Sequence, residues 1–151
     1  MHSRQRGFTL IELMLVLVVL GLVYGLVFFR LDHILTRYRL RGAARDVLAT
    51  MQLARSQAVS QQRPFRVIFD MDGRAFWLQR EDGPPAAKRP LPEGVRIERV
   101  TTAGRSRSSG RAAVEYTPVG GAASVRVDVV SDDGRKISIR VDPLNAYAHV
   151  E

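Results

Sequence analysis

The chain contains no cysteine among its 151 residues. This absence excludes a disulfide framework, a thiolate metal site and a cysteine nucleophile, so the folded part must be stabilised by its own hydrophobic core. Histidine is also scarce, because only His2, His33 and His149 occur and they are widely separated. No nucleophile elbow, phosphate-binding loop or metal-ligand spacing accompanies them. We therefore expect no enzymatic activity, no metal site and no cofactor.

Charged side chains are nearly absent from one long stretch near the amino terminus. From Phe8 to Phe29 the only charged residue is Glu12. As a helix this run would be roughly 33 Å long, enough to cross a hydrocarbon core of about 30 Å. The run ends in "VFFRLDH", which lacks the small residues of a signal-peptidase site. The pattern favours a lasting transmembrane helix over residues 8–29 and disfavours a cleaved secretory signal.

The remainder of the chain is mixed and more charged. Its length fits one folded domain in addition to the membrane anchor. The formal net charge is +8. Such a balance suits an acidic partner, namely nucleic acid, anionic lipid or an acidic protein face, but it is equally consistent with an arginine-rich, solvated surface.

The carboxylate of Glu12 is the anomaly of the apolar run. An acidic side chain inside a membrane helix costs a few kcal/mol and is by default a functional hypothesis. Two structural alternatives are a position near the lipid headgroups and a favourable interaction with the positive end of the helix macrodipole. If the chain were cut after Gly7, Phe8 would carry a free ammonium four positions before Glu12, on the same helical face. Pairing of these charges between chains would then favour assembly in register.

The sequence "RGFTLIEL", Arg6 to Leu13, resembles the processing and assembly motif of type IV pilins and type II secretion pseudopilins. The resemblance implies a prepilin leader peptide over residues 1–7, cleaved between Gly7 and Phe8 by a prepilin peptidase. It implies N-methylation of Phe8. It also implies that Glu12 pairs with the amino terminus of a neighbouring subunit in the filament.

A second periodic segment follows the apolar run. Between Ile34 and Val59 there is no proline, and apolar or small residues recur every three or four positions, at Ala44, Val47, Leu48, Met51, Ala54 and Ala58. Pro64 and the polar residues before it predict the end of the helix. We expect one helix from Phe8 to about Gln61, with residues 30–62 forming a periplasmic amphipathic half.

From Phe65 the hydrophobic period changes from helical to two. The segments "PFRVIFD" and "AFWLQRE" flank the turn "DMDGR", and "SVRVDVV" and "KISIRVD" flank "SDDGR", so two hairpins are predicted. Further strands are expected at "VRIERV" and "VEYTP". Residues 65–151 should therefore form an antiparallel β-domain. The expected fold class is α+β and pilin-like, with a long amino-terminal helix packed on an antiparallel sheet.

Three polar segments between the strands have alternative interpretations. We expect residues 81–94 to be an exposed, proline-rich connection and residues 101–111, "TTAGRSRSSGR", to be a mobile loop. Arg105, Arg107 and Arg111 in that loop are candidate contacts for an anion or for DNA, or are simply solvated. The segment "DMDG" resembles the start of a calcium loop but lacks the later ligands, so a hairpin turn is favoured.

The later segments resemble the H-type minor pseudopilins of type II secretion and their FimT-like relatives in type IV pili. The features concerned are "LARSQAVSQQRPFRVIF", an aromatic-x-Pro turn, a strand pair and a final short strand after "DP". Two functions follow from this resemblance. The first is a structural subunit near the tip of the periplasmic pseudopilus that supports protein export. The alternative is a minor pilin of a type IV pilus that binds DNA during uptake.

The resemblance also implies partners and a location. The partners are other minor and major pseudopilins, the prepilin peptidase, the inner-membrane assembly platform and secreted cargo. The chain would cross the inner membrane once, with the amino terminus cytoplasmic and the carboxyl-terminal domain periplasmic, before it joins a pseudopilus. The arginine-rich segment 30–45 departs from the positive-inside rule for that orientation, and its role is open.

Overall fold

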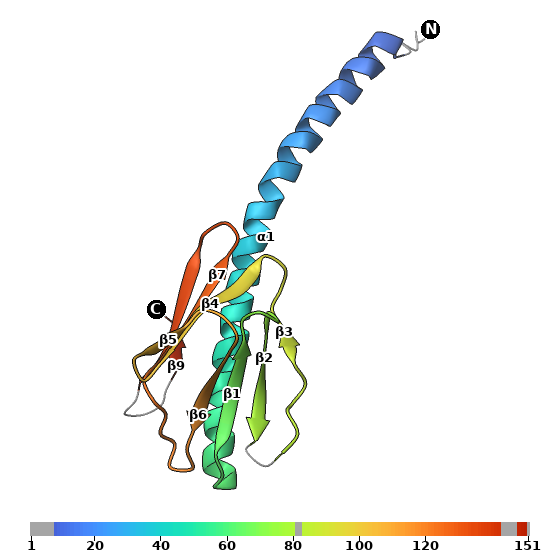
Figure 1. The fold of residues 1–151 in the computed structure, drawn as a ribbon. Helices are drawn as coiled ribbons and strands as arrows, with labels where there is room; N and C mark the ends of the chain where they lie inside the picture. Colours follow the sequence, from blue (N-terminus) through green and yellow to red (C-terminus); the bar gives the residue numbers. More distant parts are fainter. Residues whose placement is uncertain (1–7, 81–82, 143–147, 151) are drawn as a thin grey trace. The chain divides into compact units, whose positions relative to one another are not determined.

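The computed structural model describes residues 8–80, 83–142 and 148–150, and the side chains of residues 26–34 and 148–150 are outside that description. Within these residues one helix precedes nine strands (Figure 1). The predicted α+β class, a long helix followed by antiparallel strands, is confirmed. The elements are α1 (Leu10–Gln61), β1 (Phe65–Asp70), β2 (Ala75–Arg80), β3 (Arg89–Pro90), β4 (Val95–Thr102), β5 (Arg105–Arg107), β6 (Arg111–Tyr116), β7 (Val125–Ser131), β8 (Lys136–Val141) and β9 (Ala148–Val150).

Helix α1 begins at Leu10, two residues later than predicted, because Thr9 caps it. The backbone N–H of Glu12 donates to the Thr9 hydroxyl at 3.3 Å and to the Thr9 carbonyl at 3.1 Å. A threonine followed three residues later by glutamate is the capping-box pattern, which satisfies backbone donors that have no partner within the helix. The cap therefore fixes where the helix starts.

The end of α1 lies where the sequence predicts it, before Pro64. Gln62 adopts a left-handed conformation with a φ of 51°. The N–H of Arg63 then donates to the carbonyl of Ala58, and the N–H of Gln62 donates to that of Val59. This is the hydrogen-bond pattern of a Schellman motif, which closes the last turn and redirects the chain into β1.

The chain forms two compact units, Met1–Leu35 and Thr36–Glu151. In the first unit every described side chain, in residues 8–25 and at Leu35, is exposed. The large apolar side chains from Phe8 to Tyr24 are between 45% and 81% exposed. An apolar surface on all sides of a helix is typical of a segment that other molecules cover.

In the second unit, one face of α1 is buried against the strands. The predicted three-and-four spacing is confirmed, since the buried apolar positions are Leu40, Ala43, Ala44, Val47, Met51, Ala54 and Ala58. Four of them are alanines, whose small side chains allow the strands to approach the helix closely. Leu48 is only partly buried at the edge of this face.

The strands form two antiparallel sheets. Their strand orders are β3-β2-β1-β6 and β5-β4-β7-β8-β9. Both sheets lie beside the second half of α1, residues 36–61, in Figure 1, and residues of both share one hydrophobic core with it. In β1 the inward residues Phe65, Val67 and Phe69 alternate with partly exposed ones. The two predicted hairpins, β1–β2 and β7–β8, are present with the expected turns.

Two segments predicted as loops contain strands instead. Residues 84–90 are exposed, as expected of the segment 81–94, but Arg89 and Pro90 form β3, which pairs with β2, and Leu91 is buried. Residues 101–111 were expected to be mobile, but Thr102 and Arg105 face each other across a tight turn. Positive φ values at Ala103 and Gly104 form this turn, as in two-residue hairpins. Arg105 and Arg107 therefore lie on strand β5.

The β7–β8 hairpin buries more than the alternation predicts. Val125, Val127 and Val129 are buried on one face of β7. Arg126 and Asp128 alternate with them, so the other face would ordinarily be solvated, yet Asp128 and Val130 on that face are also buried. Asp128 tolerates burial because it accepts a hydrogen bond from the Ser138 hydroxyl at 2.7 Å and forms an ion pair with Lys136 at 2.9 Å.

Candidate functional site

The start of α1 carries the residues predicted to act in processing and assembly. Gly7 and the rest of the predicted leader, residues 1–7, lie outside the described residues. Phe8 is 81% exposed, and Glu12 is exposed in the first helical turn. We expected Phe8 and Glu12 to share a helical face. They do not, because Thr9 caps the helix and Phe8 lies before its first turn. The roles of Gly7, Phe8 and Glu12 remain predictions.

The predicted transmembrane segment, residues 8–29, extends into residues whose side chains are not described. No described helical stretch has both the length and the apolarity needed to cross a membrane. The span, like the predicted boundary at residue 30, stays a prediction.

The second candidate is a basic groove between two edge strands. Arg105 and Arg107 on β5 and Arg111 on β6 line a cavity of about 560 Å³, together with Val100, Thr102, Ala103, Ala112 and Ala113. All three arginines are exposed. Strand β5 is the edge of the five-stranded sheet and β6 the edge of the four-stranded sheet. The structure therefore brings the three predicted arginines together at one site, which we call the arginine groove.

Three contacts hold Arg111 in position at one side of the arginine groove. The Nη1 of Arg107 donates to the carbonyl of Arg111 at 3.3 Å, and the Nε of Arg111 forms an ion pair with Oδ2 of Asp70 at 3.1 Å. The Arg111 guanidinium also lies over the Trp77 ring, 5.7 Å from its centroid. These contacts place a cation at a defined position. Neither Arg105 nor Arg107 forms an ion pair with another described residue.

The neighbouring turn at Asp70–Gly73 is a hairpin turn, as predicted. Oδ1 of Asp70 accepts a hydrogen bond from the N–H of Gly73 at 2.9 Å. This bond lowers the pKa of Asp70, and the adjacent Arg111 lowers the pKa further. Oδ2 of Asp72 accepts a bond from the N–H of Gly110 at 3.0 Å. Both carboxylates thus bond the protein itself, and the described part of the chain contains no cluster of three metal-ligating side chains.

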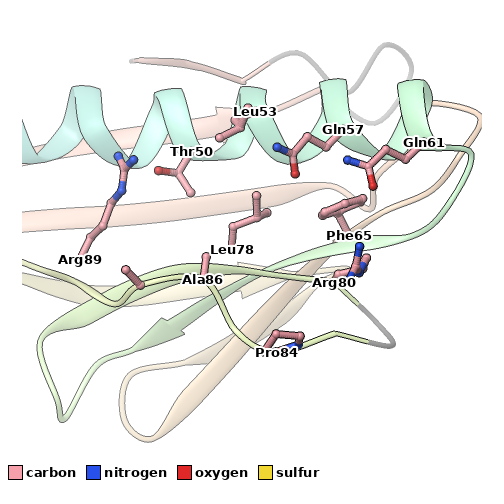
Figure 2. A pocket seen from close by; sticks show the side chains of 11 residues that line it. Thr50, Leu53, Gln57, Gln61, Phe65, Leu78, Arg80, Pro84, Ala86 and Arg89 are labelled. Atoms are coloured by element: carbon pink, nitrogen blue, oxygen red, sulfur yellow. The ribbon is translucent and has the colours of Figure 1, made fainter.

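A further hollow of about 350 Å³ lies between α1 and the segment from β2 to β3. Figure 2 shows Thr50, Leu53, Gln57 and Gln61 on the helix side and Leu78, Ala86 and Arg89 across from them. Its described lining includes apolar, hydroxyl, amide and guanidinium groups, and no carboxylate or imidazole is among the described residues that line it.

Sequence reasoning missed several residues of the arginine groove. Asp70 and Trp77 lie outside the segment that carries the arginines, and only the pairing of β1 with β2 and β6 brings them near Arg111. Ala113 lies opposite Ile68 of β1 and lines the groove. The alternation in "RAAVEY" was a usable signal, because it assigns Ala113 to the outward face of its strand.

Comparisons with known proteins agree with these features. The family model described as "Type II transport protein GspH" matches residues 43–145, which is more than half of the chain. The prokaryotic N-terminal methylation motif matches residues 2–28. Among curated proteins, none is significantly similar to this chain in sequence.

Solved structures share the fold at low sequence identity. The minor pseudopilin EpsH from the type 2 secretion system of Vibrio cholerae has a TM-score of 0.59 at 11% identity, over 74% of this chain and 94% of that one. The type IV minor pilin FimU of Pseudomonas aeruginosa has a TM-score of 0.56 at 18% identity, over 76% of this chain and 90% of that one. These likenesses show a minor-pilin fold.

Proposed function

Because the chain belongs to the GspH family of type II transport proteins, we propose that it is a minor pseudopilin of type II secretion. Its work is structural: it joins a short periplasmic pseudopilus, near the tip, and supports protein export. The observation that carries this proposal is the apolar start of α1. Its exposed side chains from Phe8 to Tyr24 form a surface that neighbouring subunits or lipid would cover.

Processing is part of the proposal. A prepilin peptidase cleaves between Gly7 and Phe8 and methylates the new amino terminus. The match of residues 2–28 to the N-terminal methylation motif supports this step. Glu12 then pairs with the Phe8 ammonium of a neighbouring subunit. In a water-poor filament core each of these charges would be costly alone, so their pairing favours one register.

The location follows from the same steps. The chain is anchored in the inner membrane by residues 8–29, with its amino terminus cytoplasmic and the unit Thr36–Glu151 in the periplasm. Other minor and major pseudopilins, the assembly platform and secreted cargo are its partners. The exposed row Arg37, Arg41 and Arg45, spaced four apart on one face of α1, would meet acidic side chains or lipid headgroups near the membrane surface.

The decisive experiment is amino-terminal sequencing and intact mass of the membrane-extracted protein, made with and without its prepilin peptidase. We expect a mature chain that starts at methylated Phe8 only when the peptidase is present. A chain that still starts at Met1 in its presence would contradict the proposed pathway. Secretion and twitching assays in a deletion strain then separate the type II role from that of a type IV pilus subunit.

The nucleic-acid alternative concerns the arginine groove. One observation favours it, which is that Arg105, Arg107 and Arg111 line a single cavity. Binding to phosphates would be weakened steeply by salt. A filter-binding assay with single- and double-stranded DNA at low and high salt tests it, and an absence of salt-sensitive binding at low salt would reject it.

A further inference from the structure

From the geometry of the arginine groove we infer that it is a strand-addition site, which binds an extended acidic segment of another protein along the free edge of β6. The inference goes beyond the proposed function and does not depend on whether the chain enters a pseudopilus. Its basis is the direction of the backbone groups of β6, the charge of the groove and the small side chains that line it.

The outer edge of β6 presents backbone groups that can pair with a further strand. The N–H of Met71 donates to the carbonyl of Gly110 at 3.0 Å. This bond makes Asp70 and Arg111, which face each other, a non-hydrogen-bonded pair of the antiparallel ladder. The N–H and C=O of Arg111 therefore point away from β1. By alternation, those of Ala113 do so as well.

One further contact agrees with this direction, because Nη1 of Arg107, a residue that lines the groove, donates to the carbonyl of Arg111. Among the described residues no strand pairs with this edge of β6, apart from the single bridge between Tyr116 and Ala122 at its end. The carbonyl of Arg111 is held by the side chain of Arg107, which an incoming strand would displace. The other outward N–H and C=O groups form a ready template for another chain.

The charge of the groove selects the partner. Arg111 is neutralised by Asp70, and Asp72 bonds Gly110 at the end of the groove. Arg105 and Arg107 carry no such counter-charge from the described residues, so the excess charge at the cavity is positive. An added strand whose side chains on the groove side are carboxylates would pair with both arginines.

The size and lining of the groove suit an added strand. Its volume is about 560 Å³, and its lining includes the small side chains of Ala103, Ala112 and Ala113, which leave room for a backbone beside the arginines.

The test uses labelled peptides and the 151-residue chain in detergent micelles. The probe is a short peptide in which Glu alternates with Val and Thr. One matched peptide replaces each Glu with Lys, and another keeps all side chains but carries N-methyl groups on alternate backbone amides. We expect fluorescence anisotropy to show binding of the Glu peptide, with both matched peptides at least about tenfold weaker.

Two pairs of variants assign the binding to the groove. Arg105→Glu with Arg107→Glu should weaken the Glu peptide about tenfold or more, whereas Arg41→Glu with Arg45→Glu on α1 should not. Ala113→Pro removes an outward N–H and leaves the β1–β6 ladder intact, so it should weaken binding while Ala113→Val does not. Trp77 fluorescence and near-UV circular dichroism check that each variant is folded.

Hydrogen exchange gives a readout that needs no variant. In the wild-type chain the Glu peptide should slow the exchange of the outward amides of Arg111 and Ala113. Equal binding of the N-methylated peptide, or unchanged exchange there, would overturn the inference. Binding of a single-stranded oligonucleotide that depends on Arg105 and Arg107 but not on Ala113, with no binding of the Glu peptide, would replace it with a nucleic-acid site.

Discussion

Asp128 and Lys136 are joined by an ion pair of 2.9 Å across the β7–β8 hairpin, in which the carboxylate is buried and the ammonium is partly exposed. The side chain of Asp128 is 5% exposed and that of Lys136 is 44% exposed. Lys136 also bonds Glu98 of β4 at 3.1 Å. One cation thus links three adjacent strands of the five-stranded sheet through two carboxylates, on the face away from the hydrophobic core.

The first prediction concerns the replacement Asp128→Asn. Asparagine keeps the acceptor for Ser138 but loses the charge that Lys136 neutralises, so unfolding free energy at neutral pH should fall by about 1 to 2 kcal/mol. Urea unfolding of the detergent-solubilised chain, followed by the fluorescence of its single tryptophan, measures the change. Asp132→Asn is the matched control, because its pair with Arg96 is exposed and should matter little.

The pH dependence of this variant gives a second check. Burial by itself would raise the pKa of Asp128, but the hydrogen bonds from Ser138 and Lys136 outweigh burial and hold the pKa below its usual value of 3.8. Because its pKa is lower in the folded state, ionised Asp128 stabilises the fold above pH 3.8. This contribution is lost as the pH falls through the folded-state pKa. The difference between wild type and Asp128→Asn should therefore shrink below pH 3.8. A difference that stays constant on acidification would contradict the ionised pair.

Removing the hydroxyl of Tyr116, unlike removing the charge of Asp128, should cost little stability. Tyr116 is fully buried, and its hydroxyl has no hydrogen-bond partner among the described residues. Tyr116→Phe should leave the free energy of unfolding within about 1 kcal/mol of wild type or raise it. Tyr116→Ala, which removes the ring, should cost about 3 to 5 kcal/mol. A large loss in the Phe variant would mean that the hydroxyl has a partner.

The same tyrosine predicts an alkaline effect. Burial raises the pKa of Tyr116 well above the usual value of 10.0, although nearby Arg55 opposes the shift. Because the folded state keeps its proton at a pH where the unfolded state loses it, stability should decline as the pH rises above 10.0. Tyr116→Phe should decline less steeply over that range in the same urea assay.

Packing of α1 on the sheets predicts the effect of a core truncation. Met51 is 0% exposed at the centre of the buried helical face. Met51→Ala should lower the free energy of unfolding by about 2 to 5 kcal/mol, because it leaves a cavity that the surrounding strands cannot fill. Leu53→Ala is the control, since Leu53 is 43% exposed on the same helix and should cost less than about 1 kcal/mol. Equal losses in the two variants would contradict the orientation of the helix.

Periodicity predicted the parts of the fold that bury a clear hydrophobic face. The stripe from Ala44 to Ala58 and the alternation of Val125, Val127 and Val129 lie where their spacing places them. Strand β5 was missed because its sequence, "RSR", has no apolar residue. Its pairing with β4 rests on backbone bonds, a turn with positive φ and the contact of the Thr101 and Ser106 hydroxyls at 2.8 Å.

Of the two candidate sites, one could be identified from contiguous sequence and the other only in part. The motif around Glu12 is continuous in sequence, so its residues could be named directly. In the arginine groove only the arginines could be predicted, because the strand register that places Arg111 opposite Asp70 is not evident from the sequence. The burial of Asp128 could not be predicted either. A strand face that carries Arg126 and Asp128 suggests contact with water, and burial of the carboxylate is possible only because Ser138 and Lys136 on β8 bond it.

The last prediction separates two roles of Glu12. The structure shows only its backbone N–H bonded to the Thr9 hydroxyl, at the position where a capping box would also use the Glu12 side chain, while the proposed function gives that side chain a charge-pairing role in the filament. Glu12→Gln keeps a side chain that can complete a capping box but removes the charge. Thr9→Ala removes the capping hydroxyl, at a cost of about 0.5 to 2 kcal/mol, and keeps the charge.

If pairing between subunits is what Glu12 provides, Glu12→Gln should be processed to Phe8 yet recovered at strongly reduced levels in sheared pseudopilus fractions. Thr9→Ala should be incorporated at close to wild-type levels, because neighbouring subunits can hold the helix start in place. Immunoblots of filament and membrane fractions measure both. The reverse pattern, with normal incorporation of Glu12→Gln and loss of Thr9→Ala, would assign Glu12 to helix capping, because the filament would then depend on an ordered helix start and not on the carboxylate charge.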